Sequence, residues 1–269
     1  MLAYASRLTE GHALVALEET MKYARLAGVI GAAATITAGV AGYRFVFRPW
    51  QARWGATDEE VRQSMPGDEE LSNPQSVTTR AVTINARPEG IWPWLIQIGT
   101  GRAGWYSYDW IERAMGLQVE SAREIIPEYQ HLAVGDTIPL APGYEVPVKA
   151  IEPNQLLLLS DYTPSIGGSV WAITLYPLDE WRTRLVWRLR ARFNWSLGSI
   201  FGGFLSGRRD DLHHGRIDWL RELPMYLFIE PGSFLMTRKC MLGIKSRAEA
   251  YAQRQRERPG TAPATASPG

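Results

Sequence analysis

The chain has 269 residues, which is enough for one large domain or two small ones with a buried core. Its 29 lysines and arginines nearly balance its 28 aspartates and glutamates, so its overall charge gives no indication of nucleic-acid binding. Its single cysteine, Cys240, excludes an intrachain disulfide framework and a cysteine-rich zinc site.

The first predicted element is a transmembrane helix over residues 26–47, preceded by an N-terminal segment of residues 1–25. Residues 26–43 carry no charge. As a helix they rise roughly 27 Å, close to the ~30 Å hydrocarbon core of a bilayer. A buried or surface helix is the alternative. A cleaved signal peptide fits poorly, because glutamates occur in the segment before the apolar stretch.

The residues in and around this span bear on its orientation and its partners. Three basic residues precede it and four follow it, which slightly favours a single-pass protein of the cell membrane with a cytoplasmic C-terminal domain. Small side chains at Gly31, Thr35 and Gly39 also suit a helix–helix contact, so self-association through this helix is a further possible partnership.

Two segments outside the folded domain are recognised by composition. Residues 48–75 contain three prolines and the acidic run GDEE, which predict a surface linker with little regular structure. Residues 257–269 are rich in proline, alanine, threonine and glycine, which predicts a disordered tail. The folded domain is therefore expected over residues 76–256.

The folded domain is predicted to begin with a β-branched strand at 76–84 and a helix at 85–98. Pro88 suits the first helical position, and Pro93 should kink the helix. A short helix fits residues 107–116. Strand-like segments then follow one another at 136–140, 144–151, 155–160, 169–176 and 183–193.

After these strands the pattern becomes helical again. Residues 199–223 are compatible with a helix, and residues 233–253 fit one better, because apolar positions from Phe234 to Tyr251 recur at spacings of three and four. This order predicts an α+β fold in which one curved antiparallel sheet wraps a long C-terminal helix.

The strand at 183–193 alternates between two kinds of side chain. Leu185, Trp187, Leu189 and Ala191 share one face, whereas most of the other face is arginine: Arg184, Arg188, Arg190 and Arg192. This alternation predicts a half-buried antiparallel strand whose arginine face meets solvent. A structural partner role, in which that face binds acidic lipid or protein, is one interpretation.

Gly99, Gly101 and Gly104 have the G-x-G-x-x-G spacing of a dinucleotide-binding loop. Such a loop needs a strand directly before it and a βαβ unit around it. Here the motif follows a predicted helix, and the later elements are strand after strand. We therefore interpret it as a joint between two helices and expect no nucleotide or other cofactor.

Few residues suggest acid–base or metal chemistry. Tyr108, Asp109 and His131 are the weak candidates for moving protons, and they form no convincing catalytic constellation. His213 and His214 lie near aspartates at helical spacing, but solvated acid–imidazole pairs are far commoner than metal ligands, so no metal site is expected. Cys240 is expected to be a buried, inert thiol.

Aromatic residues are the strongest indication of a binding site, because the chain has 11 tryptophans and most lie beyond residue 90. Several crowd the turn between the two short helices, and two should face inward from neighbouring strands. Simple core packing is the alternative to an apolar pocket. The predicted ligand-binding residues are Trp94, Trp105, Tyr106, Tyr108, Trp110, Trp171 and Trp187.

Several segments carry a family resemblance: TTRAVTINARPEGIWPWLIQIG, GRAGWYSYDWIE, LAVGDTIPL and FLMTRKCMLGIKSRAE. Over residues 54–250 the chain resembles a membrane-tethered bacterial subgroup of the SRPBCC superfamily, also called START-like or polyketide cyclase/dehydrase. The resemblance implies a helix-grip fold with a hydrophobic cavity. That superfamily includes lipid carriers, ligand sensors, cyclases and hydrolases, without a shared catalytic residue to transfer.

The sequence thus predicts a membrane-anchored binding module rather than an enzyme. Its expected partner is a hydrophobic small molecule such as a lipid, an isoprenoid or a polyketide-like compound. The rival is a cofactor-free enzyme of the cyclase or hydratase kind, acting on a similar bound substrate.

Overall fold

The computed structural model describes residues 2–114, 120–141, 143–164, 167–193 and 230–257. The chain divides into two units, Met1–Trp50 and Gln51–Gly269. The predicted helix at 199–223, His213 and His214 and nearly all of the predicted tail lie outside the described residues.

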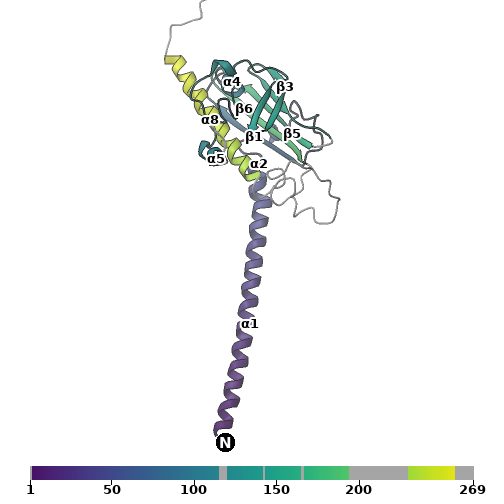
Figure 1. The fold of residues 1–269 in the computed structure, drawn as a ribbon, viewed down its shortest axis with the longest axis vertical. Coiled ribbons are helices and arrows are strands. Elements are labelled where there is room, and N and C mark those ends of the chain that lie inside the picture. The colour runs from purple at the N-terminus through teal and green to yellow at the C-terminus, as the bar shows by residue number, and fades with distance from the viewer. Residues whose placement is uncertain (1, 115–119, 142, 165–166, 194–229, 258–269) are drawn as a thin grey trace, which may run out of the picture. The chain divides into compact units, whose positions relative to one another are not determined.

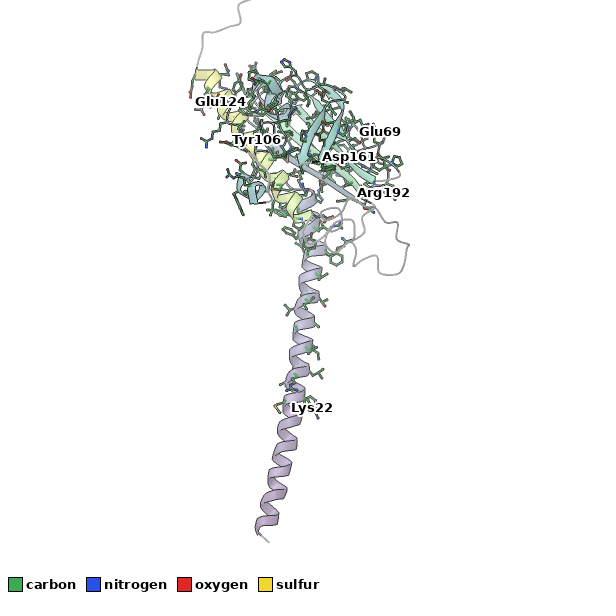
Figure 2. All side chains as sticks on the ribbon, in the orientation of Figure 1. Lys22, Glu69, Tyr106, Glu124, Asp161 and Arg192 are labelled. Atoms are coloured by element: carbon green, nitrogen blue, oxygen red, sulfur yellow. The ribbon has the colours of Figure 1, made fainter. Side chains whose placement is uncertain are left out.

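The first unit consists of helix. Helix α1 (Leu2–Gly42) continues through the π-helical turn η1 (Tyr43–Phe47) into α2 (Arg48–Ala52), whose last residues belong to the second unit (Figure 1). Within the stretch Met21–Ala52, the most apolar 18 residues have a mean hydropathy of 1.5, and the stretch is long enough to cross a membrane. The side chains drawn along this helix project outward from it (Figure 2). By length and composition alone, it is a candidate membrane span.

The second unit is built on one antiparallel sheet of six strands in the order β1-β6-β5-β4-β3-β2. Strands β2 to β6 are sequence neighbours that pair in turn, and β1 closes onto β6. All six coincide with predicted strands to within two residues. Their bounds are β1 Ser76–Ile84, β2 Thr137–Ala141, β3 Tyr144–Glu152, β4 Leu156–Ser160, β5 Gly167–Pro177 and β6 Thr183–Phe193.

Helices α4 (Pro88–Ile96) and α8 (Glu230–Glu257) contact each other and the sheet, and Figure 1 shows α8 running along one side of it. Pro88 occupies the first turn of α4 and Pro93 its interior, as predicted. We call this side of the sheet the inner face. Short elements α5 (Asp109–Ala114) and η2 (Pro127–Tyr129) complete the connection between β1 and β2.

The packing of α8 confirms the helix-grip fold. Phe234, Met241, Ile244 and Ala248 are buried, in agreement with the predicted apolar face of this helix. Gly243 permits the closest approach, because a Cβ atom there would lie 2.4 Å from the carbonyl oxygen of Tyr106. Any larger side chain at this position would force α8 away from the chain beneath it.

The opposite, outer face of the sheet is also covered, which differs from the prediction. Residues 54–71, here called the covering segment, include the short helix α3 (Asp58–Arg62). Met65 and Leu71 of this segment are 2% and 1% exposed, within a second apolar cluster that includes Val186. Residues 48–75 are therefore not a free linker. Their prolines break regular structure, but isolated apolar residues still pack on the sheet.

The arginine face of β6 lies under this covering segment, so the prediction that it meets solvent is wrong. The side chain of Arg188 is 3% exposed. Its five N–H groups donate to five acceptors: the hydroxyl of Thr79, a carboxylate oxygen of Asp68 and the carbonyls of Glu60, Val61 and Gln63. The alternation of side chains along a strand shows which face is polar. It does not show whether that polar face contacts water or acidic residues of another segment of the chain.

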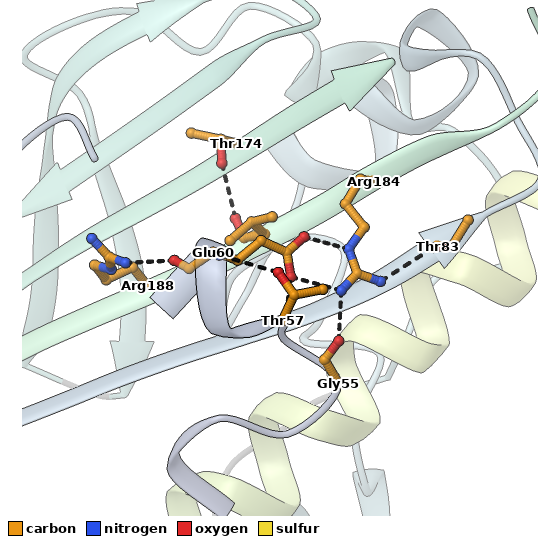
Figure 3. A network of polar contacts seen from close by, with 8 residues as sticks. Gly55, Thr57, Glu60, Thr83, Thr174, Arg184 and Arg188 are labelled. Atoms are coloured by element: carbon orange, nitrogen blue, oxygen red, sulfur yellow. Dashed lines mark hydrogen bonds and ion pairs between the residues drawn. The ribbon is translucent and has the colours of Figure 1, made fainter. Parts of the chain in front are cut away.

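Arg184 extends this network through Glu60 (Figure 3). The guanidinium of Arg184 donates to both carboxylate oxygens of Glu60, at 2.6 and 2.8 Å. Arg190 lies 3.3 Å from Asp68, so Asp68 forms ion pairs with both Arg188 and Arg190. Arg184, Arg188 and Arg190 of β6 therefore bind acidic residues of their own chain.

Glu60 also caps helix α3. Its backbone N–H donates to the hydroxyl of Thr57, and its carboxylate accepts from the Thr57 backbone N–H at 2.7 Å, which completes a capping box. Burial by itself would raise the pKa of Glu60. The bonds from Arg184 and Thr57 outweigh that effect and hold the pKa below its ordinary value.

Replacing Arg188 by Gln is expected to lower the free energy of unfolding by about 3–5 kcal/mol, since it breaks a buried, fully bonded ion pair. Urea denaturation of the unit from Gln51 onward measures this loss. The control is Arg182→Gln. Arg182 pairs with Asp179 at side-chain exposures of 56% and 41%, so its loss should cost no more than about 1 kcal/mol. Equal losses in the two variants would contradict the buried role of Arg188.

The lowered pKa of Glu60 predicts acid sensitivity of the covering segment. A carboxylate whose folded pKa is depressed contributes stability that is fully present above its unfolded pKa, near 4.5, and is lost as pH falls through the folded value. Urea midpoints measured from pH 7 down to pH 3 should therefore fall more steeply for the native chain than for Glu60→Gln. Parallel curves would show that Glu60 does not carry this acid dependence.

Candidate functional site

A cavity of about 290 Å³ lies between the inner face of the sheet and α8. Strands β2, β5 and β6, the loop before α5 and the first half of α8 all contribute to its wall. The lining residues are Trp105, Ser107, Leu140, Ala141, Trp171, Trp187, Ser233, Met236, Thr237 and Cys240.

Three tryptophans form a continuous aromatic wall on one side of the cavity. The ring centroids of Trp105 and Trp171 are 6.3 Å apart, and those of Trp171 and Trp187 are 6.0 Å apart, both at tilted angles. These separations lie within the roughly 4.5–7 Å range of favourable ring pairs. Trp171 is the middle ring, so its orientation determines whether the wall is continuous.

The polar groups of the cavity are uncharged at neutral pH. Hydroxyls come from Ser107, Ser233 and Thr237, and Cys240 contributes a buried thiol. The Ser107 hydroxyl lies 3.4 Å from the carbonyl oxygen of Met236, a long hydrogen bond. None of the lining residues that the structure describes carries a carboxylate, an ammonium, a guanidinium or an imidazole. A charged ligand group would therefore be desolvated without a charged partner.

The predicted aromatic residues separate into cavity-lining and other positions. Trp105, Trp171 and Trp187 line the cavity. Trp94 and Tyr106 are each 1% exposed and pack edge to face at 6.1 Å in the core. Trp110 is 66% exposed, and Tyr108 lies under the ammonium of Lys239 at 5.7 Å. The last four residues lie outside the cavity lining.

Tyr106 illustrates how the core supports the site. Its side chain lies beside α8 (Figure 2), and the Nε2 group of Gln97 donates to its hydroxyl at 2.6 Å. Burial raises the pKa of Tyr106 well above its ordinary value, so the phenol stays neutral. The guanidinium of Arg247 lies 4.3 Å from the ring centroid. Tyr106 is thus a structural residue beneath the site.

The weak acid–base candidates also lie away from the cavity lining. Asp109 accepts hydrogen bonds from the hydroxyl of Ser121 at 2.6 Å and from its backbone N–H at 3.2 Å, which ties the first residue of α5 to the chain at Ser121. His131 is exposed. Among the residues that the structure describes, no group of three or more His, Cys, Asp or Glu side chains is placed to hold a metal ion.

The glycine motif positions one cavity tryptophan. Gly99 and Gly104 form an antiparallel bridge that closes a loop directly after α4. Helix α4 rather than a strand directly precedes this loop, and every pairing in the described sheet is antiparallel, so the dinucleotide interpretation fails. Within the loop, the Thr100 hydroxyl donates to the carbonyl of Leu140 and accepts the indole N–H of Trp105.

Most of the α8 wall was missed by the sequence analysis. Ser233, Met236, Thr237 and Cys240 follow one another at spacings of three, one and three residues, as expected for one face of a helix. Helical spacing was therefore the available signal. It does not show which of two adjacent stripes faces the cavity and which packs in the core.

No protein-family model matches the chain, and no curated protein matches it. A protein of Mesorhizobium loti is 17% identical, with a TM-score of 0.34, over 65% of this chain and 98% of its own. A Polyketide_cyc-like protein of Corynebacterium glutamicum is 13% identical, with a TM-score of 0.31, over 67% and 91%.

A di-domain ARO/CYC protein from the steffimycin biosynthetic pathway is also similar. It is 12% identical, with a TM-score of 0.35, over 71% of this chain and 56% of its own. Two of these three proteins bear names of the polyketide cyclase group that the sequence resembles. At such identities and scores, no activity carries over to this chain.

Proposed function

We propose that this chain is a membrane-anchored binding module whose inner-face cavity holds a compact, uncharged, apolar molecule. One observation carries the proposal: three tryptophans form a wall of a cavity whose lining, among the described residues, includes no charged side chain. Small-molecule sites are typically apolar and aromatic, with a few placed polar groups. The hydroxyls of Ser107, Ser233 and Thr237 supply such groups here.

The size of the cavity narrows the ligand class. Its volume of about 290 Å³ is at the lower end of the roughly 300–1,000 Å³ of ligand pockets. A short isoprenoid or a small polyketide-like ring compound suits this volume better than a two-chain lipid. An ionised fatty acid is disfavoured, because its carboxylate would have no cationic partner among the lining residues.

The N-terminal helix supports a membrane location for the module. Beyond the apolar stretch, Tyr43, Phe47 and Trp50 form a ladder of rings with centroids 5.8 and 5.6 Å apart. Arg44 and Arg48 are interspersed with them. Aromatic and basic residues are typical of the boundary between lipid and water. A molecule that partitions into the bilayer would then be concentrated near its binding module.

The enzyme alternative has less support from the cavity. A cyclase or hydratase needs a proton donor or acceptor at the substrate, and within the described part of the lining only Cys240 has a readily titratable side chain. Tyr108, Asp109 and His131 lie outside it. Measured conversion of a bound ring compound into a product would support the enzyme alternative.

Naphthol, an uncharged two-ring fluorophore, is expected to bind and to quench part of the tryptophan emission. Ala141→Phe, which fills the cavity, should weaken binding at least tenfold, whereas Val134→Phe, at a 63% exposed position, should not. NAD should leave the melting temperature unchanged, because a ligand of the folded state would raise it. Binding that is insensitive to Ala141→Phe would place naphthol elsewhere and contradict the proposal.

Full-length protein is expected to stay with membranes through a high-salt or carbonate wash, since an apolar helix is held by lipid rather than by charge. A chain that begins at Gln51 should be recovered in the soluble fraction. Immunoblots of washed membranes and supernatant measure both. If the wash releases the full-length chain, residues 26–47 do not span the bilayer.

A further inference from the structure

A chain of hydrogen bonds holds the middle tryptophan of the cavity wall. The indole N–H of Trp171 donates to the hydroxyl of Ser169 at 2.8 Å. That hydroxyl donates to the Asp161 carboxylate at 2.8 Å, and the Ser169 backbone N–H donates to the same oxygen at 2.7 Å. The second Asp161 oxygen accepts from the hydroxyl of Tyr144 at 2.7 Å.

The direction of every bond in this chain is determined by its two ends. An indole nitrogen can only donate, and a carboxylate can only accept. The single proton of the Ser169 hydroxyl is therefore committed to Asp161, and its lone pairs remain for Trp171. Burial and the bond to Asp161 raise the pKa of the Tyr144 hydroxyl, so it remains a donor at neutral pH.

The backbone around Asp161 is held as tightly as its side chain. Ser160 pairs with Val170 across β4 and β5, which brings Asp161, labelled in Figure 2, beside Gly168 and Ser169. A Cβ atom at Gly168 would lie 2.7 Å from the carbonyl oxygen of Asp161, and Gly168 has a φ of +137°, which disfavours any other residue. Ser169 is 2% exposed. The carboxylate is thus placed by the sheet itself rather than by a loose surface contact.

We propose that Asp161 is a positioning residue of the cavity, which acts through Ser169 to fix the Trp171 indole and so makes the site select flat ring compounds over flexible chains. This inference rests on the proposed function. Because Trp171 is the ring common to both aromatic pairs, its rotation would break the wall at both contacts. A flat ligand needs the wall in one orientation, whereas a flexible chain adapts to several. If the Trp171 ring is already fixed before binding, the binding free energy of a flat ligand is not reduced by the cost of ordering that ring.

The test compares naphthol with decanol, an uncharged chain, on the full-length protein in lipid nanodiscs, with empty nanodiscs subtracted. Asp161→Asn and Ser169→Ala should weaken naphthol binding about three- to tenfold, the range for one neutral hydrogen bond, and leave decanol binding within about twofold. In Asp161→Asn, an amide N–H₂ group would face one of the N–H or O–H groups that now donate to the carboxylate, so that hydrogen bond would be lost.

Two controls separate positioning from general damage. Thr100→Val removes the hydrogen-bond partner of a different cavity indole, Trp105, and should not reproduce the Asp161→Asn effect in near-UV circular dichroism bands that depend on Trp171. In a Trp171→Phe background, Asp161→Asn should cause no further loss of naphthol binding, since the two residues act as one unit.

Equal losses for naphthol and decanol, or a loss from Asp161→Asn that persists in Trp171→Phe, would overturn the inference. If Asp161→Asn does not fold, the same comparisons with Ser169→Ala decide the matter. If the native chain binds neither probe, the proposed function fails. The near-UV band that disappears in Trp171→Phe then decides the positioning role alone: its change in Ser169→Ala supports the role, and an unchanged band overturns it.

Discussion

The guanidinium of Arg188 sets the main constraint on this domain. A planar cation with five N–H donors, buried on a sheet, is tolerated only where five acceptors surround it. One acceptor is on β1 and the other four are on residues 60–68. Arg188 therefore contributes four of the hydrogen bonds that hold the covering segment over the outer face, and two further arginines of β6 add others. Met65 and Leu71 of that segment lie in the second apolar cluster.

The two faces of the sheet consequently serve different purposes. A cavity forgoes packing contacts, and empty volume in a core is destabilising. The outer face offsets this by burying a second cluster on the same strands. Trp187, which lines the cavity, and Arg188, which holds the cover, are consecutive in β6 and point to opposite faces. A one-residue slip of this strand would exchange them, so the ionic network also specifies the register on which the site depends.

The regular elements could be predicted from the sequence because each has a local signal. The strand at 76–84, the proline-led α4 and the three–four spacing of α8 were all visible in windows of about ten to twenty residues. The inward direction of Trp171 and Trp187 followed from strand alternation. The covering segment had no such signal, since Met65 and Leu71 are isolated and its hydrogen-bond partners on β6 lie 119 to 129 residues away.

The site was predictable only in part, for a similar reason. Counting aromatic residues identifies a region rich in rings, but it does not separate Trp94 and Tyr106, which fill the core, from Trp105, which faces the cavity. That distinction depends on volume left unfilled by several elements at once. Asp161 and Ser169 belong to no motif. They become partners only when β4 and β5 pair beside Gly168.

The position of the covering segment at the start of the domain has a consequence during biosynthesis. Glu60 leaves the ribosome 128 residues before Arg188, to which its carbonyl binds. At about 5–20 residues per second, roughly 6–25 seconds pass between the two events. Throughout that interval the second apolar cluster, to which Met65 and Leu71 belong, lacks its β6 residue Val186, and the covering segment lacks the arginines that bind it. The outer face is therefore completed only after the last strand has been made, by a segment that precedes the first strand.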